Sequence, residues 1–387
     1  MPSPPETRRP RATYNPDHRR RTHTPAPTDA EIERRRERFV TPAVSAELAY
    51  YRQLGLRTRI LTLPVMGALV LGLIWRRIPG VCALQRTLAR ERILWVERQT
   101  VSQSALSDRF LDFPAVLFER VLSRVLAHLP ERLRTRTRPH PPMLAGAAAR
   151  FAGAYALDAT PLEPLFRTRA ALQDGTGVQL AGHVRAAVDL LTHLPAKRWW
   201  SDDPHTNEKA VAARVLAWLP RDRLLVLDLG SFAYWLCDAV TDVQRWFVTR
   251  LRAKARYTVT RVLCERPAVR DQRIQLGLHN DPCRHPVRLV EVFVNGHWQR
   301  YVTTVRDPQR RSIVEVVARY DARWRIATTF LLVKRLLDLG DVWVGRQNGV
   351  WLHVLATFLC YRILIDRCAD VADAVGVRLE QVSVEMV

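Results

Sequence analysis

The sequence lacks the patterns of several common classes of protein. Its six cysteines form no Cys-x-x-Cys pair and are ordinary for 387 residues in a reduced cytoplasm, so they indicate neither a zinc finger nor a disulfide framework. Residues 1–21 have no apolar segment, which excludes a secretory signal. The longest apolar run, Ile60–Trp75, is interrupted by Thr62 and Pro64 and falls short of the roughly 20 residues of a membrane-spanning helix. We therefore expect a buried helix there, and a soluble, cytoplasmic, nucleoid-associated protein without a membrane partner.

Lysine and acidic residues are also scarce. Only four lysines are present, yet Lys and Arg together number 60 against 38 Asp and Glu, which leaves a formal net charge of +22. A soluble enzyme of small neutral molecules has no need of this excess, so we expect a polyanion as partner. The planar fork of arginine suits phosphate, although a bias toward GC-rich codons gives the same skew.

Composition and periodicity divide the chain into five parts. Residues 1–40 are rich in Pro and Arg and predict a disordered basic arm. Residues 41–130 have helical periodicity and predict an all-α domain. A linker is expected over residues 131–150, a mixed α/β domain over residues 151–345, and helices over residues 346–387.

Within the α/β part, strands alternate with a helix before a β-rich stretch. The predicted strands of its first half are Phe151–Leu157, Val178–Leu191 and Arg223–Leu227, and Asn207–Leu219 is the helix between the last two. The β-rich stretch has predicted strands at Tyr257–Leu263, Val287–Val294 and Trp298–Val305. Helices are predicted at Ser312–Leu337, Trp351–Ile365 and Cys368–Val375.

Two aspartates stand where predicted strands end. Asp158 follows Ala154–Leu157, and Asp228 follows Leu224–Leu227. Carboxylates at the ends of adjacent core strands are the usual scaffold for a divalent metal that acts on a phosphodiester. An aspartate at a strand end also serves as a helix cap or turn residue, and these two residues alone leave both interpretations open.

A cationic edge is predicted on the helix Ser312–Leu337. At 100° per residue, Tyr320, Arg323, position 327 and Lys334 fall within an arc of about 60°. The neighbouring stripe of the helix is apolar and would dock it on the sheet. One edge would then present a phenol, a guanidinium and an ammonium beside the two aspartates, and could hold a DNA phosphate with them.

The spacing of these residues resembles a known signature. Tyr320-x-x-Arg323, position 327 and Lys334 resemble the YREK signature of the DDE transposases of bacterial insertion sequences, in the insertion-sequence-four family. Further matching segments occur in the right order, so that the resemblance covers about residues 45–387. They are Ile60 to Pro64, Val101 to Leu106, Asp158 to Thr160, Asp228 to Phe232, Phe247 to Leu251, Arg323 to Ile326 and Ser383 to Met386.

The resemblance implies a fold. It is an RNase H-like catalytic domain over residues 151–345, interrupted by a β-rich insertion at about residues 257–312 and preceded by the helical domain, which would bind DNA. The implied partner is double-stranded DNA at the inverted-repeat ends of the element, bound by a dimer.

The resemblance also implies roles for individual residues. Asp158 and Asp228 match the first two catalytic carboxylates, which hold Mg²⁺ or Mn²⁺. Tyr320, Arg323 and Lys334 match the positions that contact phosphate.

One position departs from the family pattern. Ala327 stands where the family has its metal-binding glutamate, and the next acidic residues, Asp338 and Asp341, lie about 16 Å or more along the predicted helix. Two-metal phosphoryl transfer uses three carboxylates, and loss of a central catalytic group commonly costs roughly 10³-fold in rate. We therefore expect impaired catalysis. Because the family runs on past Ser383 to Met386, we also expect a truncated C-terminal region and natural decay of the element.

Two other groups of residues carry weaker predictions. His279, Asp281, Cys283 and His285 alternate, but Asn280, Pro282 and Pro286 favour a loop, which argues against a zinc site. Three tryptophans could stack on unpaired bases or pack in the core. For Trp324 the apolar stripe beside it favours packing, and for Trp199 and Trp200 both interpretations stay open.

The sequence therefore predicts an insertion-sequence transposase that binds element ends and cuts and joins DNA strands, weakened by Ala327. The alternative is a catalytically inactive, DNA-binding relic of a transposase. A third interpretation, an RNA-binding or structural protein without a site, requires the aspartates and the Tyr320 to Lys334 spacing to be coincidental.

Overall fold

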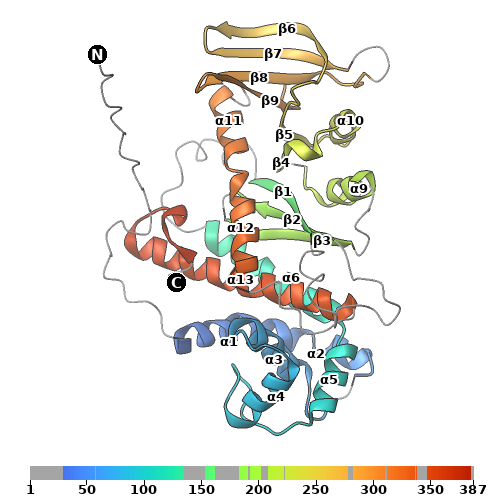
Figure 1. Cartoon of the computed structure of the whole chain (residues 1–387), viewed down its shortest axis with the longest axis vertical. Coiled ribbons are helices and arrows are strands. Elements are labelled where there is room, and N and C mark those ends of the chain that lie inside the picture. Colours follow the sequence, from blue (N-terminus) through green and yellow to red (C-terminus); the bar gives the residue numbers. More distant parts are fainter. Residues whose placement is uncertain are drawn as a thin grey trace, which may run out of the picture.

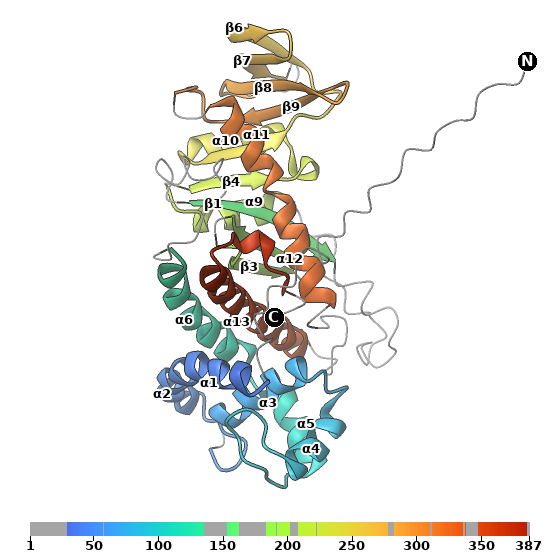
Figure 2. The same ribbon diagram turned by 90° about the vertical axis from the view of Figure 1, so that its left-hand side faces the viewer.

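The computed structural model describes most of the chain. The described residues are 29–56, 58–134, 153–161, 183–190, 192–201, 208–221, 223–277, 282–309, 312–335, 337 and 347–384. A helical region lies at one end of the molecule and a large mixed β-sheet at the other, with a long C-terminal helix between them (Figure 1 and Figure 2). The fold is thus mixed α/β with a helical N-terminal region. The predicted arm up to residue 28 and the predicted linker from residue 135 lie outside the described residues.

The N-terminal helices follow the apolar pattern of the sequence. They are α1 (Asp29–Ala46), α2 (Leu48–Gln53), α3 (Leu63–Trp75), α4 (Val81–Arg90), α5 (Gln103–Asp112) and α6 (Ala115–Arg134). Helix α3 is buried from Met66 to Ile74, which confirms that the run Ile60–Trp75 forms a buried helix. It begins only at Leu63 because Pro64 occupies its first turn, where a missing N–H is tolerated.

Helix α1 lies in a stretch whose composition predicts disorder. The chain is helical from Asp29, with Ile32 and Val40 buried, whereas the disordered arm is predicted to extend to residue 40. Arg35 of this helix pairs with the buried carboxylate of Asp366 at 2.5 Å. Tertiary contacts therefore order an arginine-rich segment whose composition alone indicates disorder.

The C-terminal helix α13 (Gln347–Val375) connects the two ends of the molecule. It packs against α3, α6 and the edge of the sheet, and it is one helix where the sequence predicts two. The side chain of Asn348 accepts a hydrogen bond from the Ala115 N–H at 2.9 Å and donates one to the Phe113 carbonyl at 2.7 Å. Residues 348–375 are long and apolar enough to cross a membrane, but 89% of the most apolar window is buried inside the protein. That apolar composition fits a core helix.

The described strands form one sheet in the order β3-β2-β1-β4-β5-β9-β8-β7-β6. Strands β1, β4 and β5 are parallel to one another, and the other neighbours pair antiparallel. The strands are β1 (Gly153–Pro161), β2 (His183–Asp189), β3 (Pro195–Ser201), β4 (Arg223–Leu227), β5 (Trp246–Arg250), β6 (Tyr257–Arg266), β7 (Val269–Leu276), β8 (Val287–Val294) and β9 (His297–Thr303). Sequence periodicity identified β1, β2 and β4 but not β3 or β5.

Helices cover both faces of the first five strands. Because alternate residues of a strand point to opposite faces, Tyr155 and Leu225 pack toward α9 (Glu208–Trp218) and α10 (Tyr234–Asp242). Ala156 and Val226 belong to the core on the other face, with α11 (Ile313–Asp321), α12 (Trp324–Arg335) and α13. Figure 1 shows α11 and α12 running along this side of the sheet.

The predicted β-rich insertion is an antiparallel continuation of the same sheet. Strands β6, β7, β8 and β9 pair in chain order, and β9 pairs with β5 through Val248 opposite Thr303. Strands β6 to β9 therefore extend the sheet beyond β5, and β9 is the one that lies next to the parallel strands.

The prediction of one continuous helix over Ser312–Leu337 is wrong. Ser312 caps the start as a capping box with Glu315, but the chain turns at Ala322–Arg323 and divides into α11 and α12. At the corner, the Arg323 N–H donates to the Tyr320 carbonyl and the Ile326 N–H donates to the Arg323 carbonyl, three residues back in each case. A single helical wheel therefore does not relate Tyr320 to Lys334.

Candidate functional site

The two predicted aspartates lie side by side on the parallel part of the sheet. Strands β1 and β4 pair in register up to Leu157 opposite Leu227, and Asp158 and Asp228 are the next residue on each strand. Asp158 lies within β1 and not at its end, because β1 continues to Pro161 by pairing with β2. Asp228 ends β4 and its carboxylate accepts the Gly230 N–H at 3.4 Å, so it caps the short 3₁₀ turn Leu229–Ser231. Asp228 is therefore both a helix-cap residue and a neighbour of Asp158.

Arg323 joins the two carboxylates from the α11–α12 corner. Its guanidinium nitrogens lie 3.2 Å from Asp228 and 4.0 Å from Asp158, and its side chain is 8% exposed. The carboxylates themselves remain accessible, at 29% for Asp158 and 43% for Asp228. Burial raises the pKa of the Asp158 carboxyl despite the nearby guanidinium of Arg323.

A cleft of about 610 Å³ opens next to Asp228 and Arg323. Arg250 and Arg252 at the end of β5 line it together with Tyr320, Asp321 and Trp324 of the α11–α12 corner. The guanidinium groups of Arg250, Arg252 and Arg323 therefore share one opening with two carboxylates, those of Asp228 and Asp321. A smaller hollow of about 260 Å³ on the α9–α10 side is lined by both Asp158 and Asp228, so Asp228 borders both openings.

Aromatic rings frame the guanidinium of Arg323. Its Cζ atom lies 5.6 Å from the centre of the Tyr320 ring and 4.9 Å from that of Trp324, and Arg250 lies 5.7 Å from Tyr320. Tyr320 is almost fully buried, and burial raises the pKa of its phenol. Trp324 is 65% exposed, so the prediction that it packs in the core is wrong. The turn at Arg323 removes Trp324 from the apolar stripe and places it at the rim of the cleft.

Ala327 and Lys334 lie further along α12. Ala327 is half-buried one turn after Arg323, on the helix that packs against β1. Lys334 is half-buried and its pKa is lowered by burial, and it lies about 16 Å along the axis from Arg323. It lines neither opening beside the aspartates, so the structure brings Tyr320 and Arg323, but not Lys334, to them. Asp338 and Asp341 lie outside the described residues.

Asp158 and Asp228 are the residues that could hold a divalent cation. Asp158 and Asp228 offer oxygen ligands in adjacent register, but no group of three His, Cys, Asp or Glu side chains suited to a metal occurs within the described part of the chain. Asp321 lines the cleft with Asp228 and its pKa is raised by burial, yet Arg250 faces it. Arg323 occupies the space beside both aspartates as their counter-ion.

The weaker sequence candidates separate in the structure. His279 and Asp281 lie outside the described residues, Cys283 is buried with its thiol directed at the Tyr234 carbonyl, and His285 contacts Asp242 at 2.8 Å. Trp199 is buried against Trp218, so of the two interpretations left open for it, core packing is the one that applies. The alternation of β3 sends Trp200 to the other face, where it stacks on Trp351.

Sequence reasoning did not single out Arg250, Arg252 or Asp321. Arg250 belongs to the matched segment Phe247 to Leu251, and Asp321 directly follows Tyr320. Their place in the cleft depends on the pairing of β5 with β4 and on the turn at Arg323, neither of which leaves a periodic pattern in the sequence.

Comparisons with known proteins give distant similarities. No family model matches the chain. It is 23% identical over 146 residues to a Sinorhizobium fredii protein named "Putative transposase y4zB", a match that covers 36% of this chain and 41% of the relative. The chain thus spans less than half the length of that relative.

Among solved structures, a piggyBac transposase synaptic complex with hairpin DNA aligns with 92% of this chain and 79% of its own, at 10% identity and a TM-score of 0.42. A score this low does not establish a common fold. The sequence similarity is to a protein named as a transposase and covers 36% of this chain.

Proposed function

We propose that the protein is a DNA transposase of the DDE type, in the insertion-sequence-four family, whose third carboxylate is replaced by Ala327. The observation that carries this proposal is the pairing of Asp158 and Asp228 on adjacent parallel strands with one shared guanidinium from the Tyr320–Arg323 corner. The sequence indicated the aspartates as strand-end carboxylates and Tyr320 and Arg323 as parts of one signature, and these residues meet although they are far apart along the chain.

The strand order supports an RNase H-like core. In the order β3-β2-β1-β4-β5, the first three strands form an antiparallel meander and the next two join β1 in parallel, which is the arrangement of an RNase H-like sheet. Asp158 on the central strand and Asp228 after the neighbouring strand then correspond to the first two catalytic carboxylates. The helix pair α11–α12 follows the β-rich stretch, as an insertion before the last catalytic helix requires.

The residues around the aspartates suit a DNA phosphate. A bound Mg²⁺ or Mn²⁺ held by Asp158 and Asp228 would activate a water or 3′-hydroxyl and stabilise charge on a leaving oxygen. Arg250, Arg252 and Arg323 would position the phosphate, since arginine pairs with two phosphate oxygens at once. Trp324 at the rim offers a face for an unpaired base. The net charge of +22 supplies the long-range attraction to duplex DNA, which we propose to be element ends bound by a dimer.

A second candidate function is DNA binding without cleavage. It is favoured by Ala327 and by the contact of Arg323 with both aspartates, because a cation must displace or accommodate this guanidinium before it binds. In this form the protein would occupy element ends without cutting them.

The test uses duplex DNA that flanks the gene and contains any inverted repeat found there. Ala327→Glu should raise Mn²⁺-dependent nicking of this DNA by orders of magnitude. Ala327→Gln introduces a side chain of the same size as glutamate but without its charge, and should not raise the nicking. Adding Asp228→Asn to Ala327→Glu should abolish the nicking. If Ala327→Glu folds, binds this DNA and Mn²⁺, and cuts nothing, the protein is the non-cutting binder.

A further inference from the structure

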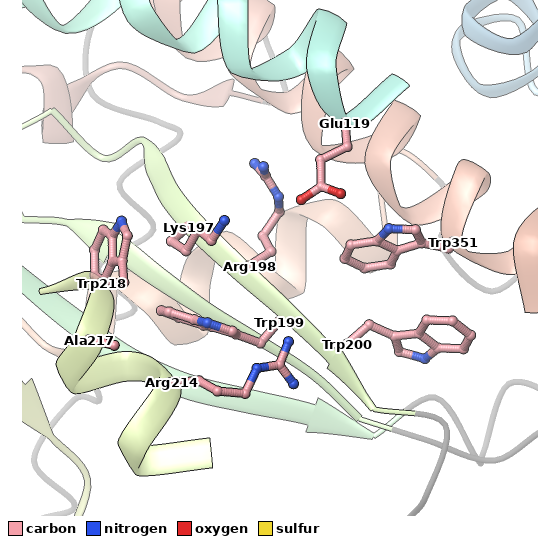
Figure 3. Close-up of a pocket in the computed structure, with 9 residues that line it drawn as sticks. All are labelled: Glu119, Lys197, Arg198, Trp199, Trp200, Arg214, Ala217, Trp218 and Trp351. Carbon is pink, nitrogen blue, oxygen red and sulfur yellow. The ribbon is translucent and has the colours of Figure 1, made fainter. Parts of the chain in front are cut away.

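A second cleft lies at the edge of the sheet, away from the aspartates. It measures about 570 Å³ and runs along β3, the outermost strand of the described sheet order (Figure 3). Four successive residues of β3, Lys197 to Trp200, line this edge with side chains that alternate between the two faces of the strand, and residues of α6, α9 and α13 complete the lining. The transposase mechanism proposed above uses none of them.

Aromatic rings line both ends of this cleft. Trp200 and Trp351 stack at one end, with ring centres 5.7 Å apart and planes 13° from parallel. At the other end, Trp218 is half-buried, and its ring centre lies 5.4 Å from that of Trp199 in a T-shaped pair. Trp200, Trp218 and Trp351 thus keep part of their surface in the cleft, where a flat ring can stack on them.

Cations outnumber acids in the same space. Lys197, Arg198 and Arg214 line the cleft, against the single carboxylate of Glu119. Arg214 is exposed, whereas Arg198 is buried, with its Nε and Nη1 atoms making no hydrogen bond. Figure 3 shows the guanidinium of Arg198 directed toward Glu119. Burial lowers the pKa of Arg198 to about 10, and a further anion in the cleft would offset the cost of this buried charge.

We propose that this cleft binds a nucleotide, with its base on the tryptophan surfaces and its phosphate at Lys197 and Arg214. Stacked aromatic side chains in a positively charged groove are what single-stranded nucleic acid binds without sequence preference. The source is an unpaired nucleotide of a DNA strand, and in this respect the inference rests on the proposed function. A free nucleotide has the same chemistry, and the experiment separates the two sources.

A peptide is the alternative occupant of an exposed sheet edge, because a strand can add to its free backbone groups. The cleft does not favour it, since three partly exposed indole rings and three cations line it beside that edge. An acidic peptide serves as the corresponding competitor in the test.

The experiment measures the affinity of the full chain for a labelled single strand of about 12 thymidylates by fluorescence anisotropy at fixed salt. The double variant Lys197→Gln/Arg214→Gln should weaken binding about tenfold, because it removes two phosphate contacts without altering the core. Its matched control is Arg261→Gln/Arg266→Gln on the exposed edge strand β6, which makes the same change in charge far from the cleft and should weaken binding less than twofold. Trp351→Leu should also weaken binding, and Trp351→Phe should restore most of it.

Two competitors identify the source. Thymidine 5′-monophosphate that displaces the strand with an affinity within tenfold of it would make a free nucleotide the ligand, and much weaker displacement would make it a DNA strand. Equal losses in the cleft and control variants, displacement by polyglutamate as effective as by the strand, or no single-strand binding would each overturn the proposal. In the proposed function, Mn²⁺ binding depends on Asp158 and Asp228, and duplex binding depends on Arg250, Arg252 and Arg323. Failure of the cleft therefore leaves the proposed function standing, and the reverse also holds.

Discussion

Two arginine–aspartate clusters, one in each half of the sheet, differ in how far their carboxylates are exposed to solvent. In the antiparallel half, Arg288 binds Asp271 through two hydrogen bonds of 2.8 Å and 2.7 Å, and both side chains are almost fully buried. In the parallel half, Arg323 reaches Asp228 at 3.2 Å and Asp158 only at 4.0 Å, and both carboxylates are partly exposed. The first pair satisfies its own charges and belongs to the fold. The second leaves carboxylate oxygens open to a ligand, which is the property of a site.

The largest expected effect breaks the closed pair. Asp271→Asn leaves the buried Arg288 guanidinium without a counter-charge and should lower the free energy of unfolding by about 3 kcal/mol or more. Asp228→Asn should lower it by less than about 1 kcal/mol, because that carboxylate is partly solvated. Urea denaturation of the two variants measures the difference. Equal losses would show that the clusters are alike and that the open one is also structural.

The second prediction concerns affinity for duplex DNA as a function of salt. If Arg250, Arg252, Arg323 and arginines of the helical region contact on the order of six phosphates, log K should fall with log[salt] at a slope near −5. A titration series from low to moderate salt measures this slope. A slope shallower than about −2 would mean that the excess charge only solvates the surface.

The third prediction concerns Arg323 itself. Arg323→Gln should weaken duplex binding about tenfold, because it removes a charged phosphate contact, and should strengthen Mn²⁺ binding, because it removes the competing counter-ion of both aspartates. Calorimetric titrations with DNA and with Mn²⁺ measure both affinities in the same preparation. Arg288→Gln is not a suitable control because it should unfold the sheet, so Arg266→Gln on β6 serves instead. A loss of both affinities would mean that Arg323 builds the site and does not compete within it.

The smallest expected effect is that of Trp324. Trp324→Leu should change the free energy of unfolding by less than about 0.5 kcal/mol, since the side chain is 65% exposed. It should weaken binding of a DNA with unpaired bases by about 1 kcal/mol through lost stacking. Thermal denaturation and anisotropy titrations measure the two effects. A large loss of stability would mean that Trp324 contributes to the core and contradict its assignment to the rim of the cleft.

The sequence predicts individual elements better than their junctions. The strand containing Asp158, the strand before Asp228 and the start of α11 at Ser312 leave local patterns, namely short apolar runs and a capping box, and they are present in the structure. The turn at Arg323 left no such pattern. It changes the spacing of a few backbone hydrogen bonds from four residues to three, and the apolar stripe in the sequence continues across it. Helix α1 was missed for another reason, since its order depends on packing against α3 and α6 and on the ion pair of Arg35 with Asp366, 331 residues away.

The candidate site shows the same division. Asp158 and Asp228 were chosen as carboxylates at strand ends, and Tyr320 and Arg323 as part of a spaced signature, and the fold brings them together. Lys334 shares that signature but lies about 16 Å further along the helix axis, a separation that a helical wheel does not represent. Arg250, Arg252 and Asp321 enter the cleft only through strand pairing and the corner between two helices, which no single stretch of sequence encodes.

The measurement that tests the central claim most directly is a Mn²⁺ titration of the full chain followed by electron paramagnetic resonance. The account predicts one weakly bound ion in the native protein, and loss of that ion in both Asp158→Asn and Asp228→Asn with duplex DNA binding retained. Asp271→Glu would not be informative because Asp271 is buried, so Asp307→Asn, an exposed aspartate in the loop after β9, is the matched control and should bind the ion as the native protein does. Unchanged Mn²⁺ binding in both aspartate variants would contradict the assignment of Asp158 and Asp228 as a metal site.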